Sequence, residues 1–74
     1  MTSIYRTYNA AAAQLGRMET QDQQQGWMVN RTLGKTVSVG SEDDGRMFRV
    51  TRTLECIPAS AGQPEKWALT TSRI

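Results

Sequence analysis

The spacing of apolar residues changes once along this chain, at Trp27, and that change constrains the fold more than any other feature. Before it, apolar residues recur at steps of three and four, the spacing of one helix face. After it, apolar and polar residues alternate, as in strands with one solvated face. With 74 residues the chain has room for one small domain. We therefore predict an α+β fold in which an N-terminal amphipathic helix precedes a small three- or four-stranded antiparallel β-meander.

The helical spacing covers residues 3–18 and gives way to a polar segment. Thr2 or Ser3 can cap the start of this helix, and four successive alanines favour helix in its middle. Residues 19–26 contain no apolar residue and include three successive glutamines, so we predict a polar linker there. The apolar face of the predicted helix consists of Ile4, Tyr8, Ala11, Leu15 and Met18.

Residues 27–74 carry the alternation of the predicted meander. Residues 27–39 are compatible with one long strand that bends at Gly34 or with two short strands that meet there. We favour the single bent strand, because the sequence around Gly34 leaves little chain for a hairpin. An Asp-Gly pair further on is a strong hairpin signal and predicts a turn before the next strand.

The strand after that turn, residues 46–57, has the clearest alternation in the chain. Arg52 interrupts its apolar face, which otherwise consists of Phe48, Val50, Leu54 and Cys56. Residues 58–64 contain both prolines and are predicted to form a loop. Residues 66–72 alternate again and are predicted to form the last strand.

A core built from these elements is small, and its largest members are aromatic. Trp27, Phe48 and Trp67 are expected to dominate it, because each can bury ~150–250 Å². Cys56 lies next to an isoleucine and is expected to be buried as a small hydrophobe. Two positions of the helix stay open: over one face of its own sheet, or detached and docked on another subunit or protein. Without disulfides or zinc, so small a core favours completion by a partner.

The chain lacks the side chains that carry most enzyme chemistry. It has no histidine, one cysteine and no glycine-rich phosphate loop. Residues 42–45 form an acidic turn without the alternating ligands of a calcium loop, so we predict no metal site. We therefore expect no enzyme, no catalytic residue, no cofactor and no small-molecule substrate.

The net charge of +2 is mildly basic and allows a second hypothesis, a nucleic-acid-binding regulator. Strand arginines next to aromatic residues could contact phosphates and stack on bases. The alternation weakens this hypothesis, because it directs Arg49 to the face opposite the other two strand arginines. The residues expected to carry such a site are Lys35, Arg46, Arg49 and Arg52.

Two segments of the chain resemble the small linker polypeptides of phycobilisomes. Residues 46–51 and 56–58 resemble the opening strand of that family, and residues 33–39 are similar to a later strand. Here the two segments occur in the reverse order, so we do not assign the chain to the family. The resemblance implies a pigment-free protein that joins light-harvesting discs, which is an assembly role.

The leading hypothesis is a small non-catalytic interaction or assembly protein, such as a structural component of a viral particle or another large complex. A related alternative is an inhibitor that masks a host enzyme. We expect a soluble, cytoplasmic protein that binds a protein partner or forms a homo-oligomer, because no long apolar run or export signal is present. The residues expected to contact the partner are Ile4, Tyr8, Leu15, Met18 and Trp27.

Overall fold

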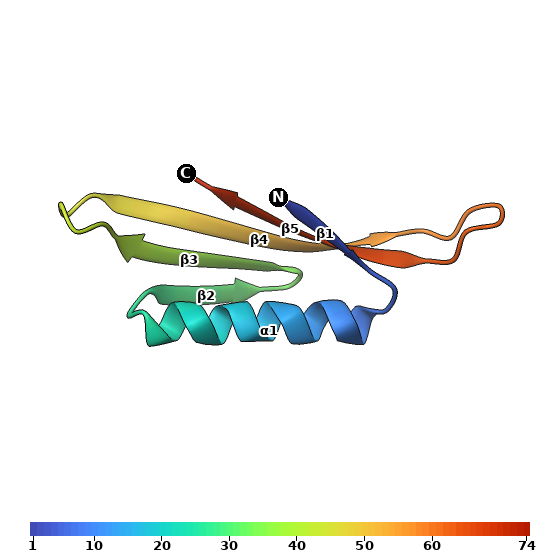
Figure 1. Cartoon of the computed structure of the whole chain (residues 1–74), viewed down its shortest axis with the longest axis horizontal. Coiled ribbons are helices and arrows are strands. Elements are labelled where there is room, and N and C mark those ends of the chain that lie inside the picture. The colour runs from blue at the N-terminus through green and yellow to red at the C-terminus, as the bar shows by residue number, and fades with distance from the viewer.

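One helix and a five-stranded antiparallel sheet make up the computed structural model, which describes residues 1–74 (Figure 1). The elements are β1 (Thr2–Tyr5), α1 (Tyr8–Gln24), β2 (Met28–Thr32), β3 (Lys35–Ser41), β4 (Met47–Ile57) and β5 (Lys66–Arg73). The strand order is β1-β5-β4-β3-β2, so four consecutive strands form a meander and the first strand adds to its far edge. The predicted α+β class is confirmed, whereas the predicted number of three or four strands is wrong.

The fifth strand is β1, which lies within the segment predicted to be helical. Residues 3–18 were expected to form the helix, but α1 begins only at Tyr8. Thr7 caps it by accepting a 3.1 Å hydrogen bond from the backbone N–H of Ala10. Ile4 lies upstream in β1, opposite Ala68 of β5. Its helical spacing from Tyr8 is coincidental, because pairing with β5 decides the conformation of so short a segment.

The helix extends through most of the segment predicted to be a linker. Residues 19–26 were expected to be a polar connection, but α1 continues to Gln24. Glu19 and Asp22 are turned inward and bind side chains of the sheet. The absence of apolar residues was therefore misleading, because these turns of the helix are held by ionic and hydroxyl contacts.

The strand predicted over residues 27–39 is two strands, β2 and β3, so the preference for one bent strand is wrong. Thr32 pairs with Lys35, which leaves a turn of only two residues. Gly34 adopts a φ of 70°, a conformation that favours glycine and lets the chain reverse over this distance. The later predictions are confirmed: the chain turns near Gly45, and β4 and β5 follow at the expected positions.

The hairpin of β4 and β5 projects beyond the other elements, at the right of Figure 1. The residues from Glu55 to Glu65 are all exposed, and we call residues 55–65 the arm. The arm makes the molecule long, with extents of 50 × 19 × 17 Å. The radius of gyration is 14.1 Å, compared with about 11 Å for a compact domain of this length.

The apolar core lies between α1 and one face of the sheet. Its buried members are Ala11, Leu15, Phe48, Val50 and Leu69. Because Leu15 is among them, the helix packs on its own sheet and is not detached. Trp27 and Trp67 are only half-buried, so Phe48 alone of the three aromatic residues fulfils the core prediction.

The aromatic packing depends on a glycine in β3. Trp27 meets Phe48 edge to face, with ring centroids 4.8 Å apart. A Cβ at Gly40 would lie 2.7 Å from Cζ of Phe48 and 2.7 Å from Cδ1 of Trp27. Because Gly40 has no side chain, the rings of Trp27 and Phe48 can both pack against β3 at this position.

Candidate functional site

The antiparallel register divides the strand side chains between two faces of the sheet. On β3, Thr36 and Ser38 are buried, whereas Val37 and Val39 are partly exposed and point the other way. Helix α1 lies against the first pair, as the hydrogen bonds from their hydroxyl groups to helix carboxylates show. We call the side that bears the helix the covered face and the opposite side the open face.

A buried ion pair ties the helix to the covered face. Asp22 is 3% exposed and accepts a 2.6 Å hydrogen bond from Oγ of Ser38. The same carboxylate oxygen binds the guanidinium of Arg52, whose side chain is 11% exposed. Nε of Arg52 is buried and makes no hydrogen bond, so this charge depends on Asp22 for compensation.

A second carboxylate repeats this arrangement one turn earlier in the helix. Glu19 accepts a 3.1 Å hydrogen bond from Oγ1 of Thr36 and a 3.0 Å hydrogen bond from Nε of Arg31. Each carboxylate thus meets one hydroxyl group and one guanidinium, which offsets the cost of removing it from water. Two such directed contacts fix the rotation of α1 about its axis. Because the single helix is held on this face, no element of the chain covers the other face of the sheet.

The open face carries most of the large apolar side chains that solvent reaches. Five of the eight exposed large apolar residues lie there by the register: Ile4, Met28, Met47, Ile57 and Ile74. The exposed fractions of Met28 and Met47 are 78% and 68%. Large side chains of this kind gain free energy when a second surface covers them.

Two rows of side chains on the open face differ in chemistry. One row across four neighbouring chain segments consists of Met28, Val39, Arg49 and Ile74. A second row crosses all five strands and consists of Thr2, Thr70, Thr53, Lys35 and Thr32. The hydroxyl oxygens of Thr2 and Thr70 lie 3.2 Å apart in this row. The face therefore offers apolar contact along the first row and short polar side chains along the second, with Ile4 and Ile57 beyond the second row.

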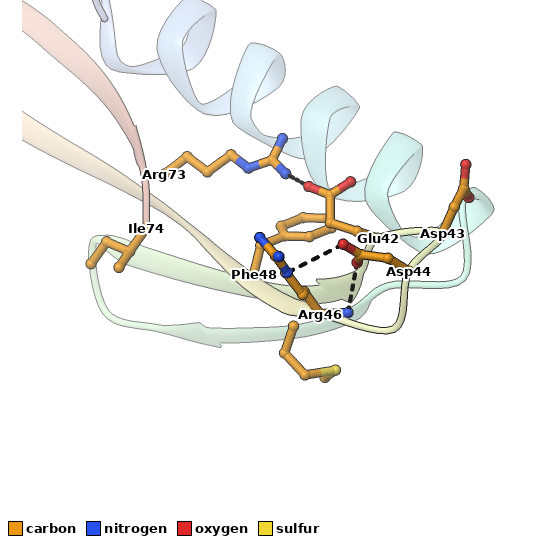
Figure 2. Close-up of a pocket in the computed structure, with 8 residues that line it drawn as sticks. Glu42, Asp43, Asp44, Arg46, Phe48, Arg73 and Ile74 are labelled. Atoms are coloured by element: carbon orange, nitrogen blue, oxygen red, sulfur yellow. Dashed lines mark hydrogen bonds and ion pairs between the residues drawn. The ribbon is translucent and has the colours of Figure 1, made fainter.

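A cleft of about 540 Å³ lies at the end of the sheet where β3 turns into β4. Figure 2 shows that Arg73 reaches Glu42 and that Arg46 folds back onto Asp44. The guanidinium of Arg73 also lies 4.2 Å from the centre of the Phe48 ring. These contacts hold the turn to the end of β5, so the charges of the cleft largely serve the fold.

A smaller hollow of about 380 Å³ lies between the helix and the turn of β2 and β3. Leu15 and Leu54 line it on the inside, while Tyr8 and Leu33 stand at its rim. Leu33 is completely exposed, and Lys35 lies beside it. The hollow can accept an apolar side chain, but it is separate from the open face.

The five residues expected to contact a partner do not form one surface. Leu15 is buried in the core, and Tyr8 packs edge to face on Trp67 with ring centroids 5.0 Å apart. Ile4 lies on the open face. Met18 and Trp27 are half-buried on the helical side. Of these residues only Ile4 is part of the apolar open face, whose other members were missed because their neighbours across the sheet were unknown.

The four cationic residues of the nucleic-acid hypothesis are also dispersed. Arg52 is held in the buried pair with Asp22, and Arg46 pairs with Asp44 of its own turn. Lys35 and Arg49 share the open face but lie four residues apart along paired strands. At ~3.4 Å per residue this separates them by about 14 Å along the strands, so they form no continuous basic stripe.

The prediction that Cys56 is buried is wrong, because the thiol lies on the arm beyond the end of the helix. Desolvation raises the pKa of Cys56, and so does the hydrogen bond of 3.3 Å that its thiol donates to the Glu65 carboxylate, together with the negative charge of that group. The raised pKa disfavours the thiolate form at neutral pH.

The comparisons with known proteins assign no function to any surface of this chain. No protein-family model, curated protein or solved structure matches the chain. The structure gathers no group of three or more His, Cys, Asp or Glu residues suited to a metal ion. The single helix is too short and polar to cross a membrane.

Proposed function

We propose that this chain is a small non-catalytic protein that binds another protein surface through its open face, as a component of a larger assembly. The observation that carries this proposal is the gathering of exposed Met28, Met47 and Ile74 on a sheet face that no element of the chain covers. Covering such side chains contributes about 1.5–3 kcal/mol each when burial is complete.

The small core supports the same proposal. Only five apolar side chains are buried on the covered face. A chain of this length buries only about 60% of the surface that its unfolded form exposes. A partner on the open face adds a second apolar layer, so binding and stability increase together.

The dispersed cations favour this proposal over a nucleic-acid regulator. A phosphate-binding surface needs several free basic side chains close together. Arg46 and Arg52 are committed to carboxylates of their own chain. The open face keeps Lys35 and Arg49, which lie apart on it, and Arg49 in the apolar row suits a protein surface with a carboxylate.

The proposal is tested with a pair of matched substitutions. Met28→Asp places a charge on the open face, whereas Leu33→Asp makes the same kind of change at an exposed turn outside it. Both variants are expected to fold, because both positions are exposed. We expect association, measured by sedimentation and by capture of binding proteins, to be lost in Met28→Asp and retained in Leu33→Asp.

Two outcomes contradict the proposal. In the first, the wild-type chain neither self-associates nor captures a protein. In the second, Met28→Asp and Leu33→Asp associate equally well. Far-UV circular dichroism of both variants separates loss of binding from loss of fold.

A further inference from the structure

The pattern of side chains along β4 identifies the partner of the open face. We propose that the partner is a second copy of this chain, stacked face to face with its β4 running antiparallel to the first. This inference rests on the proposed function and specifies its occupant. It follows from two features of β4: the order of its residues and its unpaired charges.

The open-face residues of β4 form a self-complementary series. Reading along the strand, they are Met47, Arg49, Thr51, Thr53, Glu55 and Ile57. Reversal of the series about Arg52 places an apolar residue on an apolar residue, a threonine on a threonine and a cation on an anion. A strand with this order therefore matches its own antiparallel copy.

The two charges select the direction of stacking. Neither Arg49 nor Glu55 forms an ion pair within the chain, although four other ion pairs are present. Their positions are six residues, or about 20 Å, apart on one strand, so they cannot meet each other in a single copy. Antiparallel stacking forms two Arg49–Glu55 pairs between copies, whereas parallel stacking places Arg49 against Arg49.

The apolar ends of the series meet in the same arrangement. Met47 of one copy would lie over Ile57 of the second copy, and Ile57 over Met47. Met47 is 68% exposed and Ile57 is 41% exposed in a single copy. On the adjacent strand β5, Ile74 pairs with Arg49 and Ala68 pairs with Glu55 in the register. The same reversal therefore places Ile74 over Ala68 of the second copy, which extends the apolar contact.

A two-fold axis relates the two copies. The reversal keeps the lateral order of the strands, so β4 and β5 stack on their equivalents over most of their length and β2 and β3 over about three residues each, whereas β1 lies outside the overlap. The two-fold axis lies between the sheets and passes Arg52, so the assembly closes as a dimer. About 24 overlapping residues, each covering about 4.8 Å by about 3.4 Å, give a covered face of about 390 Å² per copy. The total of about 780 Å² is in the range of weak, concentration-dependent interfaces.

In the antiparallel dimer the arm of each copy also contacts the other copy. The arm begins at Glu55, where β3 no longer accompanies β4. In the dimer the base of each arm lies along the Met47 end of the other copy. Residues that are exposed in a single copy, including Ile57, thereby become part of the interface.

A charge-reversal cycle tests the register directly. We expect sedimentation equilibrium of the wild type, from about 1 µM to about 1 mM, to give twice the monomer mass of 8.3 kDa at the upper concentrations. Arg49→Glu alone and Glu55→Arg alone each place like charges together twice and should raise the dissociation constant about 10- to 100-fold. The double variant Arg49→Glu/Glu55→Arg restores both pairs in reversed polarity. It should return the dissociation constant to within about threefold of the wild type.

Arg17→Glu is the matched control, because Arg17 is an exposed arginine on the helix, away from the open face. It should change the dissociation constant less than about threefold. A double variant that fails to recover, while circular dichroism shows an intact fold, overturns the antiparallel register.

A wild type that stays monomeric over the whole concentration range overturns the second copy as occupant. The proposed function survives that result if the wild type captures another protein and Met28→Asp does not. It fails together with the dimer if neither form of binding occurs.

Discussion

On the strand β3, the covered face and the open face reverse the usual rule that buried side chains are apolar and exposed side chains are polar. Along β3 the covered face presents Thr36 and Ser38 to the helix, whereas the open face presents Val37 and Val39. Short hydroxyl side chains allow the helix to approach closely and bind through its carboxylates. The position of the helix is thus decided by directed polar contacts, and larger apolar side chains remain available for a partner.

The largest expected effect tests whether the covered face depends on its buried ion pair. Asp22→Ala leaves the Arg52 guanidinium without its carboxylate in a site where Nε already has no partner. We expect the free energy of unfolding to fall by about 3–5 kcal/mol, measured by urea denaturation. Because a domain this small has little stability to lose, the variant is expected to be partly unfolded without denaturant.

The control for this prediction is Glu42→Ala. It removes the exposed pair with Arg73 and should cost less than about 1 kcal/mol. If Asp22→Ala costs no more than Glu42→Ala, the ion pair does not hold the helix, and the contrast between the two faces fails.

The second expected effect concerns the closeness of packing on the covered face. Gly40→Ala places a Cβ within 2.8 Å of both aromatic rings, so Trp27 or Phe48 must move. We expect a loss of about 1–3 kcal/mol in the free energy of unfolding, together with a change in tryptophan fluorescence.

Gly16→Ala is the opposite case, because a Cβ there meets no atom within 4 Å. This helical substitution should stabilise the protein by up to about 1 kcal/mol. A neutral result for Gly40→Ala would show that the rings are not held against β3.

The strands were predictable where their pattern is local. The alternation of β4 and the Asp-Gly turn before it are visible in consecutive residues, and the structure confirms both. The class of fold follows from the same pattern, since helical spacing precedes alternation. Neither β1 nor the end of the helix could be located in this way.

The failures share a physical cause, which is that partners distant in sequence decide the conformation. Ile4 joins a strand because β5 lies beside it, and the polar turns around Asp22 stay helical because Ser38 and Arg52 bind them. The open face was missed for the same reason. Met28, Met47 and Ile74 lie far apart in the sequence and gather only through the register of the sheet.

A smaller effect on stability is expected at the open face. Met28→Ala should change the free energy of unfolding of the monomer by less than about 0.5 kcal/mol, because the side chain is 78% exposed. The same substitution should weaken association with a partner on the open face about fivefold, since Met28 belongs to the apolar row of that face. Urea denaturation at low protein concentration gives the first value, and sedimentation gives the second. A large loss of monomer stability would mean that the open face is part of the core.

The smallest expected effect concerns the reactivity of the Cys56 thiol, which lies where the helix no longer covers the sheet. Cys56 lies on the helix side of β4 by the register, but it is exposed because the helix stops short of the arm. Glu65→Gln removes the negative charge that contributes to the raised pKa of the thiol, so the pKa should fall. At pH 8 more thiolate forms, and we expect alkylation by iodoacetamide to be about two- to threefold faster.

Glu55→Gln is the control for the thiol, because Glu55 is adjacent in sequence but points to the open face. The two substitutions remove the same charge, one from the loop before β5 beside the thiol and one from the opposite side of β4. Equal acceleration by both would mean that the thiol responds to net charge alone and that the contact with Glu65 is absent. Acceleration by Glu65→Gln alone would show that the division into two faces continues along the arm, even where no helix covers it.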